Sequence, residues 1–347
     1  MQVKRLLRLI SAADQADKRA YAETKKAVGD FIFKERNDVV TAIDRCTKLG
    51  HIDLANLLSR KIDGLRSSDS ILTAAGIGLR EHAVRWKLAL ASGDTFAAVG
   101  LAATLSPAPR SLRQREITRA DILEAGKHAT AAIPRIIHQV WIGPKPCPVG
   151  SPERWRAWCA KYGYEYRLWT QPDVETLACY GSHAYDFFLK QGRYAGTVDV
   201  IRADILHDVG GLYVDMDMFP VDVGAAYHDL LGMTGMICIP AKGYRRLNMG
   251  ALFLTNSILG STPGHPIMKR YKDAMSPTVA SFDGNVAAWW SVGGCLLTSA
   301  LASSVNVIAP IHLVGSAPRT DVEAIYASIG KIEASESTVL FYSCKFW

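Results

Sequence analysis

The chain has 347 residues, of which 49% are hydrophobic and 21% are charged. These proportions exclude a largely disordered chain, and the length suffices for one large domain or two smaller ones. No uninterrupted apolar run approaches the roughly 18 residues of a membrane-spanning helix, so no transmembrane segment is predicted. The formal net charge of +7 favours an anionic partner such as a nucleotide, a nucleic acid or an acidic lipid. A basic surface that serves solubility alone explains the charge better than dedicated nucleic-acid binding does.

The seven cysteines are scattered along the chain. Their number is odd and no two form a C-x-x-C pair, so the sequence indicates neither a disulfide framework nor a zinc knuckle. A reducing compartment fits this pattern, and we expect a cytoplasmic protein. Residues 1–19 are basic and weakly amphipathic, which leaves a peripheral position at a membrane surface as an alternative.

Residues 1–105 are predicted to form a helical region, because apolar side chains recur there at spacings of three and four. The repeat is clearest at Val39, Val40, Ile43, Cys46 and Leu49. Prolines after residue 106 break this register, and a basic stretch from Arg110 to Arg119 follows. We therefore expect residues 106–132 to be a linker.

From residue 133 onwards, strands and helices are predicted to alternate. The segment Ile133–Gly143 is typical of a buried strand that ends in a Gly/Pro loop. A helix from about Pro152 to Tyr162 and a second strand from Tyr164 to Trp169 are expected next. This alternation predicts an α/β layer with a largely parallel sheet, in which ligands bind beyond the carboxyl ends of the strands. Trp141 lies at such an end.

The segment Thr197–Pro220, TVDVIRADILHDVGGLYVDMDMFP, is the most informative part of the sequence. Its first half is predicted to be a helix with an apolar stripe, which Gly210 and Gly211 end. The stripe comprises Val198, Ile201, Ile205 and Val209. Asp199 and Arg202 are three residues apart, so they share a face of this helix.

A strand from Leu212 to Met218 is predicted next, and its period of two places Tyr213, Asp215 and Asp217 on one face. Two carboxylates this close repel each other unless a cation or protons intervene. A hard divalent cation such as Mn²⁺ or Mg²⁺ removes the repulsion and also binds a diphosphate. The alternative is a pair of solvated acids, because a D-x-D pattern alone occurs by chance in many proteins.

Three separate segments, in order, resemble glycosyltransferase family 32, which contains yeast α-1,6-mannosyltransferases and bacterial capsule enzymes. They are equally similar to the catalytic domain of the large clostridial glucosylating toxins. The shared pattern is D-x-x-R followed by L-x-x-x-G-G-x-Y-x-D-x-D, and it is matched by Asp199, Arg202, Leu206, Gly210, Gly211, Tyr213, Asp215 and Asp217. Residues 133–143 are similar to the family's first strand, and residues 254–266 resemble its Asn-to-Pro-Gly-His-Pro stretch. Val198 departs from the pattern, because the family usually has serine there.

The resemblance covers roughly residues 131–347. It implies a GT-A type, Rossmann-like fold that binds a nucleotide sugar in residues 133–347, behind the helical region and the linker. In this fold Asp199 and Arg202 would hold hydroxyl groups of the donor sugar, Asp215 would contact ribose and sugar, and Asp217 would ligate the metal. An ordinary ion pair at i, i+3 is the alternative for the first two residues.

The resemblance also implies roles in donor binding for four further residues. Trp141 would stack on the nucleotide base, Tyr213 would line the donor pocket, and Asn256 would face the sugar or the acceptor. Plain packing is an equal alternative for Trp141 and Tyr213, and a turn-forming role is the stronger alternative for Asn256. The chain ends in FYSCKFW, where many family members have His and then Ser-Trp, so Trp347 is assigned to the donor site. Candidates for the third metal ligand are Ser343 and His312.

The resemblance thus implies a retaining, metal-dependent glycosyltransferase that takes a hexose from a nucleotide-sugar donor. The run D-M-D-M-F-P resembles the toxin version, which favours a UDP-sugar over GDP-mannose. A glycan, a lipid-linked sugar and a protein side chain all remain open as acceptors. The alternatives are a glycosyltransferase that acts on nucleic acid, suggested by the basic charge, and a non-catalytic nucleotide-sugar-binding module.

Overall fold

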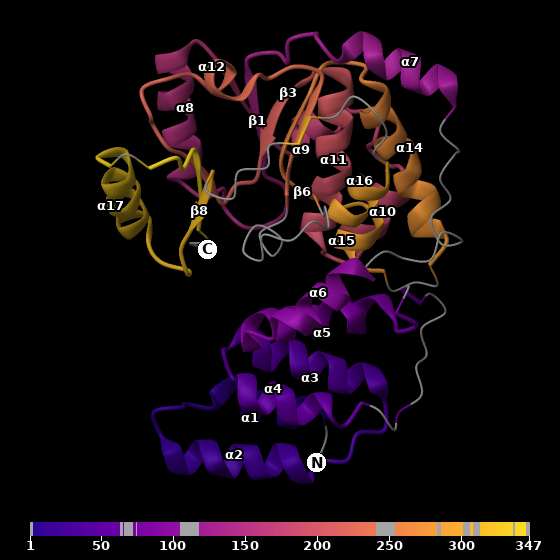
Figure 1. The fold of residues 1–347 in the computed structure, drawn as a ribbon, viewed down its shortest axis with the longest axis vertical. Helices are drawn as coiled ribbons and strands as arrows, with labels where there is room; N and C mark the ends of the chain where they lie inside the picture. Colours follow the sequence, from indigo (N-terminus) through magenta and orange to yellow (C-terminus); the bar gives the residue numbers. More distant parts are fainter. Residues whose placement is uncertain are drawn as a thin grey trace. The chain divides into compact units, whose positions relative to one another are not determined.

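The chain divides into two compact units, Met1–Leu112 and Arg113–Trp347, each with a hydrophobic core of its own (Figure 1). The computed structural model describes residues 3–62, 65, 72–73, 75–104, 118–240, 254–282, 286–300, 306–307, 313–335 and 337–344.

The described residues of the first unit are mostly helical. Its helices are α1 (Val3–Ala12), α2 (Lys18–Asp30), α3 (Arg36–Lys48), α4 (Ile52–Ser59), α5 (Leu79–Ser92) and α6 (Thr95–Ala103). Local signals set several of their ends. Asp17 caps α2 by accepting hydrogen bonds from the amides of Arg19 and Ala20, and Gly93 ends α5 in the left-handed conformation.

The apolar face of α1 is used inside the first unit. Leu6 and Ile10 are fully buried in the same core as Val39 and Ile43 of α3. That face is therefore not free to enter a bilayer while the bundle is folded. Among the described residues, no helix is both long and apolar enough to cross a membrane.

The second unit begins with a helix where a linker was expected. Residues Arg119–His128 form α7, which contacts α14 (Pro266–Ala280). The predicted linker, residues 106–132, is therefore partly wrong, because a helix with a packing partner occupies its second half. Arg110 and the residues up to 117 lie outside the described part of the chain.

Among the described residues, a six-stranded mixed sheet forms the centre of the second unit. Its strands are β1 (Ile136–Val140), β2 (Glu165–Trp169), β3 (Gly211–Val214), β5 (Met236–Pro240), β6 (Leu254–Ser261) and β7 (Asn306–Val307), in the order β2-β1-β3-β6-β5-β7. The pairs β2/β1, β1/β3 and β5/β7 are parallel, whereas β6 runs antiparallel to both β3 and β5. The predicted α/β layer with parallel strands is thus confirmed, with β6 reversed.

Helices cover both faces of this sheet (Figure 1). Besides α7, the helices among the described residues of this unit are α8 (Ser151–Tyr162), α9 (Gln171–Val174), α10 (His183–Lys190), α11 (Tyr194–Asp208), α12 (Tyr227–Leu231), α14, α15 (Ala288–Ser291), α16 (Gly294–Ala300) and α17 (Val322–Glu333), of which α8, α11 and α16 contact strands of this sheet. Trp155 and Trp158 of α8 pack into the main core beside Ile137 of β1. The helix α11 is buried from Thr197 to Leu206 except at Val198, because α10, α14 and the sheet surround it. The expected single apolar stripe is therefore wrong.

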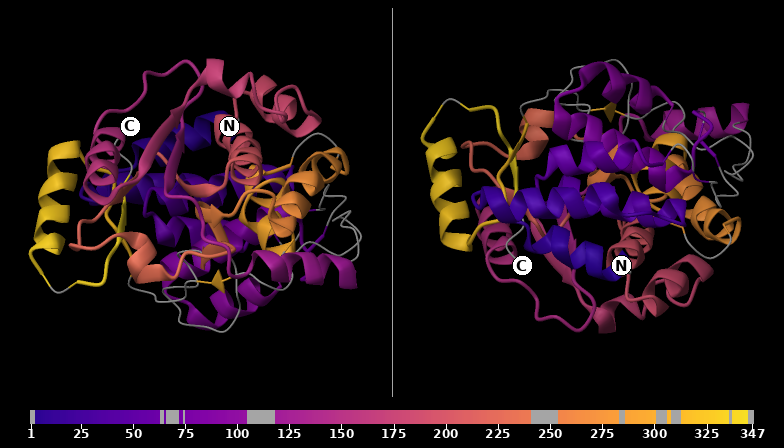
Figure 2. Two further views of the ribbon diagram at one scale, coloured as in Figure 1. Left: turned by 90° about the horizontal axis from the view of Figure 1, so that it is seen from above. Right: turned by 90° about the horizontal axis from the view of Figure 1, so that it is seen from below.

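A second, smaller sheet lies beside the main one. It consists of β4 (Met218–Pro220), β9 (Phe341–Ser343) and β8 (Val314–Ser316), in the order β4-β9-β8. Phe219 and Tyr342 of this sheet pack against Ile325 and Ile329 of α17, which stands at the margin of the unit (Figure 2). The C-terminal strand thereby comes next to the segment that follows β3.

Candidate active site

The segment from Asp215 to Asp217 is a turn and not the continuation of a strand. The strand β3 ends at Val214, and the amide of Met218 donates to the carbonyl of Asp215 at 2.9 Å. The reason is that β3 pairs with β6 in the large sheet, whereas β4 pairs with β9 in the small one. The chain must change sheets between them, so the predicted strand with two carboxylates on one face is wrong.

The turn nevertheless presents both acids to solvent. Asp215 and Asp217 are partly exposed, while Met216 between them is buried. The carbonyl of Asp217 accepts a hydrogen bond from the amide of Cys344 at 3.0 Å, so the C-terminal strand holds the turn from one side.

Arg202 lies at the centre of the site and is only 4% exposed. Its Nη2 is 2.9 Å from Oδ1 of Asp199 and 3.0 Å from Oδ1 of Asp215. Its guanidinium carbon lies 4.3 Å from the centre of the Tyr213 ring, and the Tyr213 hydroxyl donates to Oδ1 of Asp215 at 3.0 Å. One buried cation thus connects α11 to the end of β3.

Asn256 completes the network from β6. Its Nδ2 donates to Oδ1 of Asp199 at 2.9 Å, and its carbonyl accepts from Arg202. Asn256 lies within a strand, so the alternative of a turn-forming asparagine is wrong. The hydroxyl of Tyr271 in α14 is a further partner, 3.4 Å from Nδ2 of Asn256. The structure therefore brings Asp199, Arg202, Tyr213, Asp215 and Asn256 together in one network.

The charges of this network are unevenly balanced. Burial raises the pKa of Asp199 to about 7, although Arg202 acts in the opposite direction. Burial disfavours the charged form of Arg202, but the negative groups around it, Asp215 foremost, hold its pKa above the ordinary value. Two carboxylates share one guanidinium, so the cluster favours an additional positive charge or a hydroxyl donor.

The groups around the turn fit a divalent cation. Oδ2 of Asp215 has no hydrogen-bond partner among the described residues, and neither has the hydroxyl of Ser343. Ser343 pairs with Met218 across β4 and β9, one residue from Asp217. All three side chains offer hard oxygen atoms, which Mn²⁺ and Mg²⁺ prefer. The described residues contain no cluster of three or more His, Cys, Asp or Glu side chains suited to a metal, so substrate or water oxygens would have to complete the shell.

Two tryptophans lie at neighbouring strand ends. Trp141 follows β1 directly, and its amide donates to the carbonyl of Trp169, the last residue of β2, at 2.9 Å. Its indole Nε1 donates to the carbonyl of Lys145 at 2.9 Å, and both rings are partly exposed. Trp141 is thus at the carboxyl edge of the sheet, as expected. Two other predicted residues, Trp347 and His312, lie outside the described residues.

Several polar residues that support the site were not predicted from the sequence. His138 in β1 is fully buried, and it accepts from Nε1 of Trp169 at 3.0 Å and lies 2.8 Å from the carbonyl of Gly210. Burial lowers the pKa of His138 to about 4, so the ring is neutral and its Nε2 donates to Gly210. Its neighbour Gln139 is equally buried. A His-Gln pair inside the apolar run from Ile136 to Trp141 was the available signal, because buried polar groups need partners.

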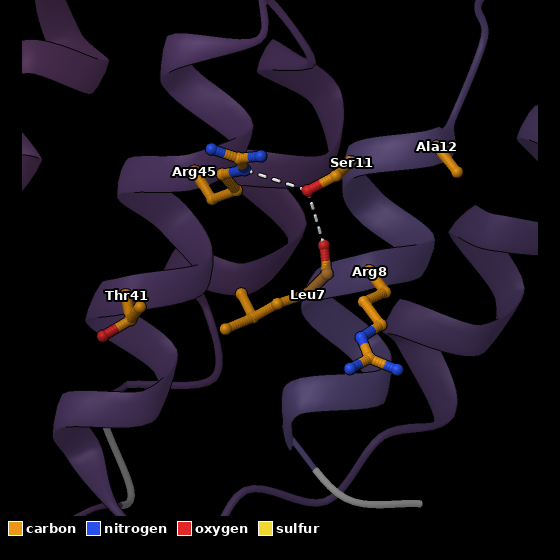
Figure 3. Close-up of a pocket in the computed structure, with 6 residues that line it drawn as sticks. All are labelled: Leu7, Arg8, Ser11, Ala12, Thr41 and Arg45. Atoms are coloured by element: carbon orange, nitrogen blue, oxygen red, sulfur yellow. Dashed lines mark hydrogen bonds between the residues drawn. The ribbon is translucent and has the colours of Figure 1, made fainter.

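A hollow of about 570 Å³ lies in the first unit, between α1 and α3 (Figure 3). It is lined by Leu7, Arg8, Ser11, Ala12, Thr41 and Arg45. Nε of Arg45 donates to the Ser11 hydroxyl at 2.9 Å, which donates to the carbonyl of Leu7 at 2.8 Å. The guanidinium of Arg8 points away from that of Arg45 (Figure 3). The two cations do not converge on one point, and no acid lines the hollow, so it offers no catalytic group.

Two curated proteins named as glycosyltransferases are similar to part of the chain. It is 29% identical over 140 residues to an uncharacterized glycosyltransferase of Acanthamoeba polyphaga mimivirus. The aligned residues make up 39% of this chain and 52% of the relative. The chain is 30% identical over 154 residues to inositol phosphoceramide mannosyltransferase 3 of Schizosaccharomyces pombe, which is 42% of this chain and 38% of the relative. Both relatives are glycosyltransferases. The expected relationship to this class of enzyme is confirmed, over about half or less of each relative's length.

No protein-family model matches the chain. Among solved structures, the PaToxG glycosyltransferase aligns with a TM-score of 0.40 and 16% identity over 52% of this chain and 73% of its own. A glycosyltransferase involved in the glycosylation of the major capsid of PBCV-1 aligns with a TM-score of 0.35 and 12% identity, over 60% of this chain and 92% of its own.

Proposed function

We propose that this chain is a metal-dependent glycosyltransferase that takes a hexose from a nucleotide sugar. The observation that carries the proposal is the buried Arg202, which binds the carboxylates of Asp199 and Asp215 at 2.9 and 3.0 Å. A surface ion pair has no need of such burial, and a buried ion cluster costs desolvation that only further partners offset. Perturbed groups of this kind collect at functional sites, and Asp199 is one of them. The similarity to two glycosyltransferases names the class of reaction.

The surroundings of the acids suggest different roles for them. Asp199 is held by Arg202 and Asn256 on the inner side of the site, where its second oxygen and the guanidinium suit hydroxyl groups of a sugar. Asp215 and Asp217 lie in the partly exposed turn, where a diphosphate can approach. The sugar and the diphosphate of one donor would therefore contact the two sides of Arg202.

Asp215, Asp217 and Ser343 are the residues that would hold the cation. When bound, a divalent cation neutralises the charge that develops on a departing nucleoside diphosphate. The chain's own contribution is to fix two carboxylates in one turn and to keep Arg202 charged beside them. Trp141 would stack on the base at the neighbouring strand end.

The finer assignment follows the resemblance to family 32 and to the clostridial toxins. It implies a GT-A type fold, retention of the donor's anomeric configuration, and a UDP-sugar rather than GDP-mannose. The acceptor is a glycan, a lipid-linked sugar or a protein side chain. Proton NMR of the product linkage tests retention, and an inverted anomer would refute the family placement.

The proposal is tested by turnover of a panel of nucleotide sugars, measured as release of the nucleoside diphosphate. We expect one donor to be hydrolysed with Mn²⁺, EDTA to abolish the activity, and Mn²⁺ to restore it. Asp217→Asn should need a higher Mn²⁺ concentration. Asp222→Asn is the matched control, because this acid lies just beyond β4 but bonds to Lys161 and Tyr162. Full activity in EDTA would refute the metal assignment, and no turnover of any donor would refute the function.

A further inference from the structure

The main chain of the Asp215–Asp217 turn is held by side chains that are not part of the network around Arg202. Gln139 in β1 is fully buried, and its Nε2 donates to the carbonyl of Asp215 at 3.1 Å and to the hydroxyl of Ser151 at 3.0 Å. Ser151, the first residue of α8, donates in turn to the carbonyl of Met218 at 2.7 Å. One side-chain amide therefore reaches both ends of the turn, directly at Asp215 and through Ser151 at Met218.

A third residue, from the neighbouring strand β2, fixes the orientation of that amide. The hydroxyl of Tyr166 in β2 donates to Oε1 of Gln139 at 2.8 Å. Burial raises the pKa of Tyr166 above its ordinary value, so the phenol keeps the proton that it donates. Each amide proton of Gln139 has an acceptor and Oε1 has a donor. A flipped amide would instead set Oε1 against the carbonyl of Asp215, so only one orientation satisfies all the groups.

We propose that Gln139 is a positioning residue for donor and cation binding, and that Tyr166, Gln139 and Ser151 form a relay that sets the directions of the Asp215 and Asp217 carboxylates. This inference rests on the function proposed above. Without the relay, the carbonyl of Asp215 keeps only its bond from the Met218 amide, and the Ser151 hydroxyl loses its donor. The turn is then held by fewer hydrogen bonds, so the directions of its two acids are less firmly fixed.

The chain offers a control that separates positioning from ordinary core stability. Tyr164 lies two residues before Tyr166, is more buried, and also makes a hydroxyl hydrogen bond, to Nδ1 of His228 at 2.6 Å. Tyr164→Phe and Tyr166→Phe therefore delete the same atom from neighbouring tyrosines. Only the second deletion touches the relay.

The test compares the full chain with Gln139→Met, Tyr166→Phe and Tyr164→Phe. For each protein, Mn²⁺ affinity in the presence of UDP, KM and kcat for donor hydrolysis, the melting temperature and the exchange rate of the Met218 amide are measured. We expect Gln139→Met to lose about 10- to 100-fold in Mn²⁺ affinity, as removal of groups that orient metal ligands does. Tyr166→Phe should also lose Mn²⁺ affinity, by a smaller factor. In both, the Met218 amide should exchange faster, because its acceptor carbonyl is less firmly held.

Tyr164→Phe should change the melting temperature alone. The relay is overturned if Tyr166→Phe matches Tyr164→Phe in Mn²⁺ affinity, KM and Met218 exchange, and this comparison decides even if Gln139→Met does not fold. If the wild type turns over no nucleotide sugar, the proposed function fails and Met218 exchange alone decides the relay. Faster exchange in Tyr166→Phe then supports it, and exchange equal to that of Tyr164→Phe overturns it.

Discussion

Arg202 gives the site its chemical character at the scale of single residues. A guanidinium keeps its charge when buried, and Nη2 of Arg202 lies within hydrogen-bond distance of two carboxylates, those of Asp199 and Asp215. Because Arg202 is shared, Asp199 and Asp215 are coupled, and a change at either one alters the charge that the other senses.

Asp199→Asn tests the assignment of this residue to the sugar. The variant keeps the size of the side chain and removes the negative charge, so sugar hydroxyls lose a charged acceptor. We expect donor hydrolysis to fall by roughly 100-fold or more, in line with the removal of one preorganised electrostatic contact. Binding of UDP, followed by calorimetry, should remain near that of the wild type.

Asp204→Asn is the control for loss of a buried acid from the same helix. Asp204 is fully buried, but it pairs with Lys272 and accepts from the amide of Cys179 at 2.8 Å, outside the network of Arg202. It should lower the melting temperature and leave KM for the donor unchanged. An equal loss of UDP affinity in Asp199→Asn would contradict its assignment to the sugar.

The site residues that belong to the D-x-x-R and D-x-D patterns could be predicted from the sequence. Asp199, Arg202, Tyr213 and Asp215 form one network, and Asn256 joins it from a segment 41 residues beyond Asp215. Tyr271 and Gln139 were not predicted, because their importance depends on which carbonyl or amide they meet. That is decided by strand pairing and helix packing, and no local pattern records it.

At the scale of elements, Gly210 forms the junction between α11 and β3. Gly210 has a φ of 72°, and a Cβ built there would lie 2.7 Å from Cδ of Pro263 and 2.9 Å from the carbonyl of Ser261. Glycine is therefore required for two reasons, the left-handed backbone and the close approach of the segment after β6.

Gly210→Ala should be clearly more destabilising than Gly224→Ala. Gly224 has a similar φ of 78°, but a Cβ there meets no atom within 4 Å. Both variants carry the cost of a left-handed alanine, of order 1 kcal/mol, and only Gly210→Ala adds a clash with backbone. Urea unfolding measures the difference. Equal losses of stability in the two variants would show that the packing against Pro263 is not tight.

The regular elements followed from local patterns, and the turn did not. Periodicity and glycine signals predicted α8, α11, β1 and β2 to within a few residues. The predicted strand across Asp215 to Asp217 was wrong, because the alternation of side chains along a sequence gives no sign of where the chain passes from one sheet to another. The partner of β4 is β9, near the C-terminus, and a pairing over that distance leaves no signal in the segment itself.

At the scale of the whole molecule, the first unit has a separate core and contains none of the motif residues. We expect it to govern acceptor choice, membrane contact or assembly, and the alternative is that its helices stabilise the second unit. A chain shortened to begin at residue 113, ahead of α7, should stay soluble and hydrolyse the donor but no longer glycosylate acceptor. Loss of donor hydrolysis or precipitation would show that the first unit is structural.

Calorimetric titration of UDP-hexoses into the full chain, with and without Mn²⁺, directly tests whether a nucleotide sugar binds at Asp215 and Asp217 through a cation. Asp215 and Asp217 lie in one turn beside a buried Arg202, so a diphosphate should bind there only when a cation offsets the repulsion of the two acids. We predict that one UDP-hexose binds with Mn²⁺, and that its binding is lost in EDTA and in Asp217→Asn. Equal affinity with and without the metal would contradict the metal dependence of donor binding, and no binding of any nucleotide sugar would contradict the proposed function.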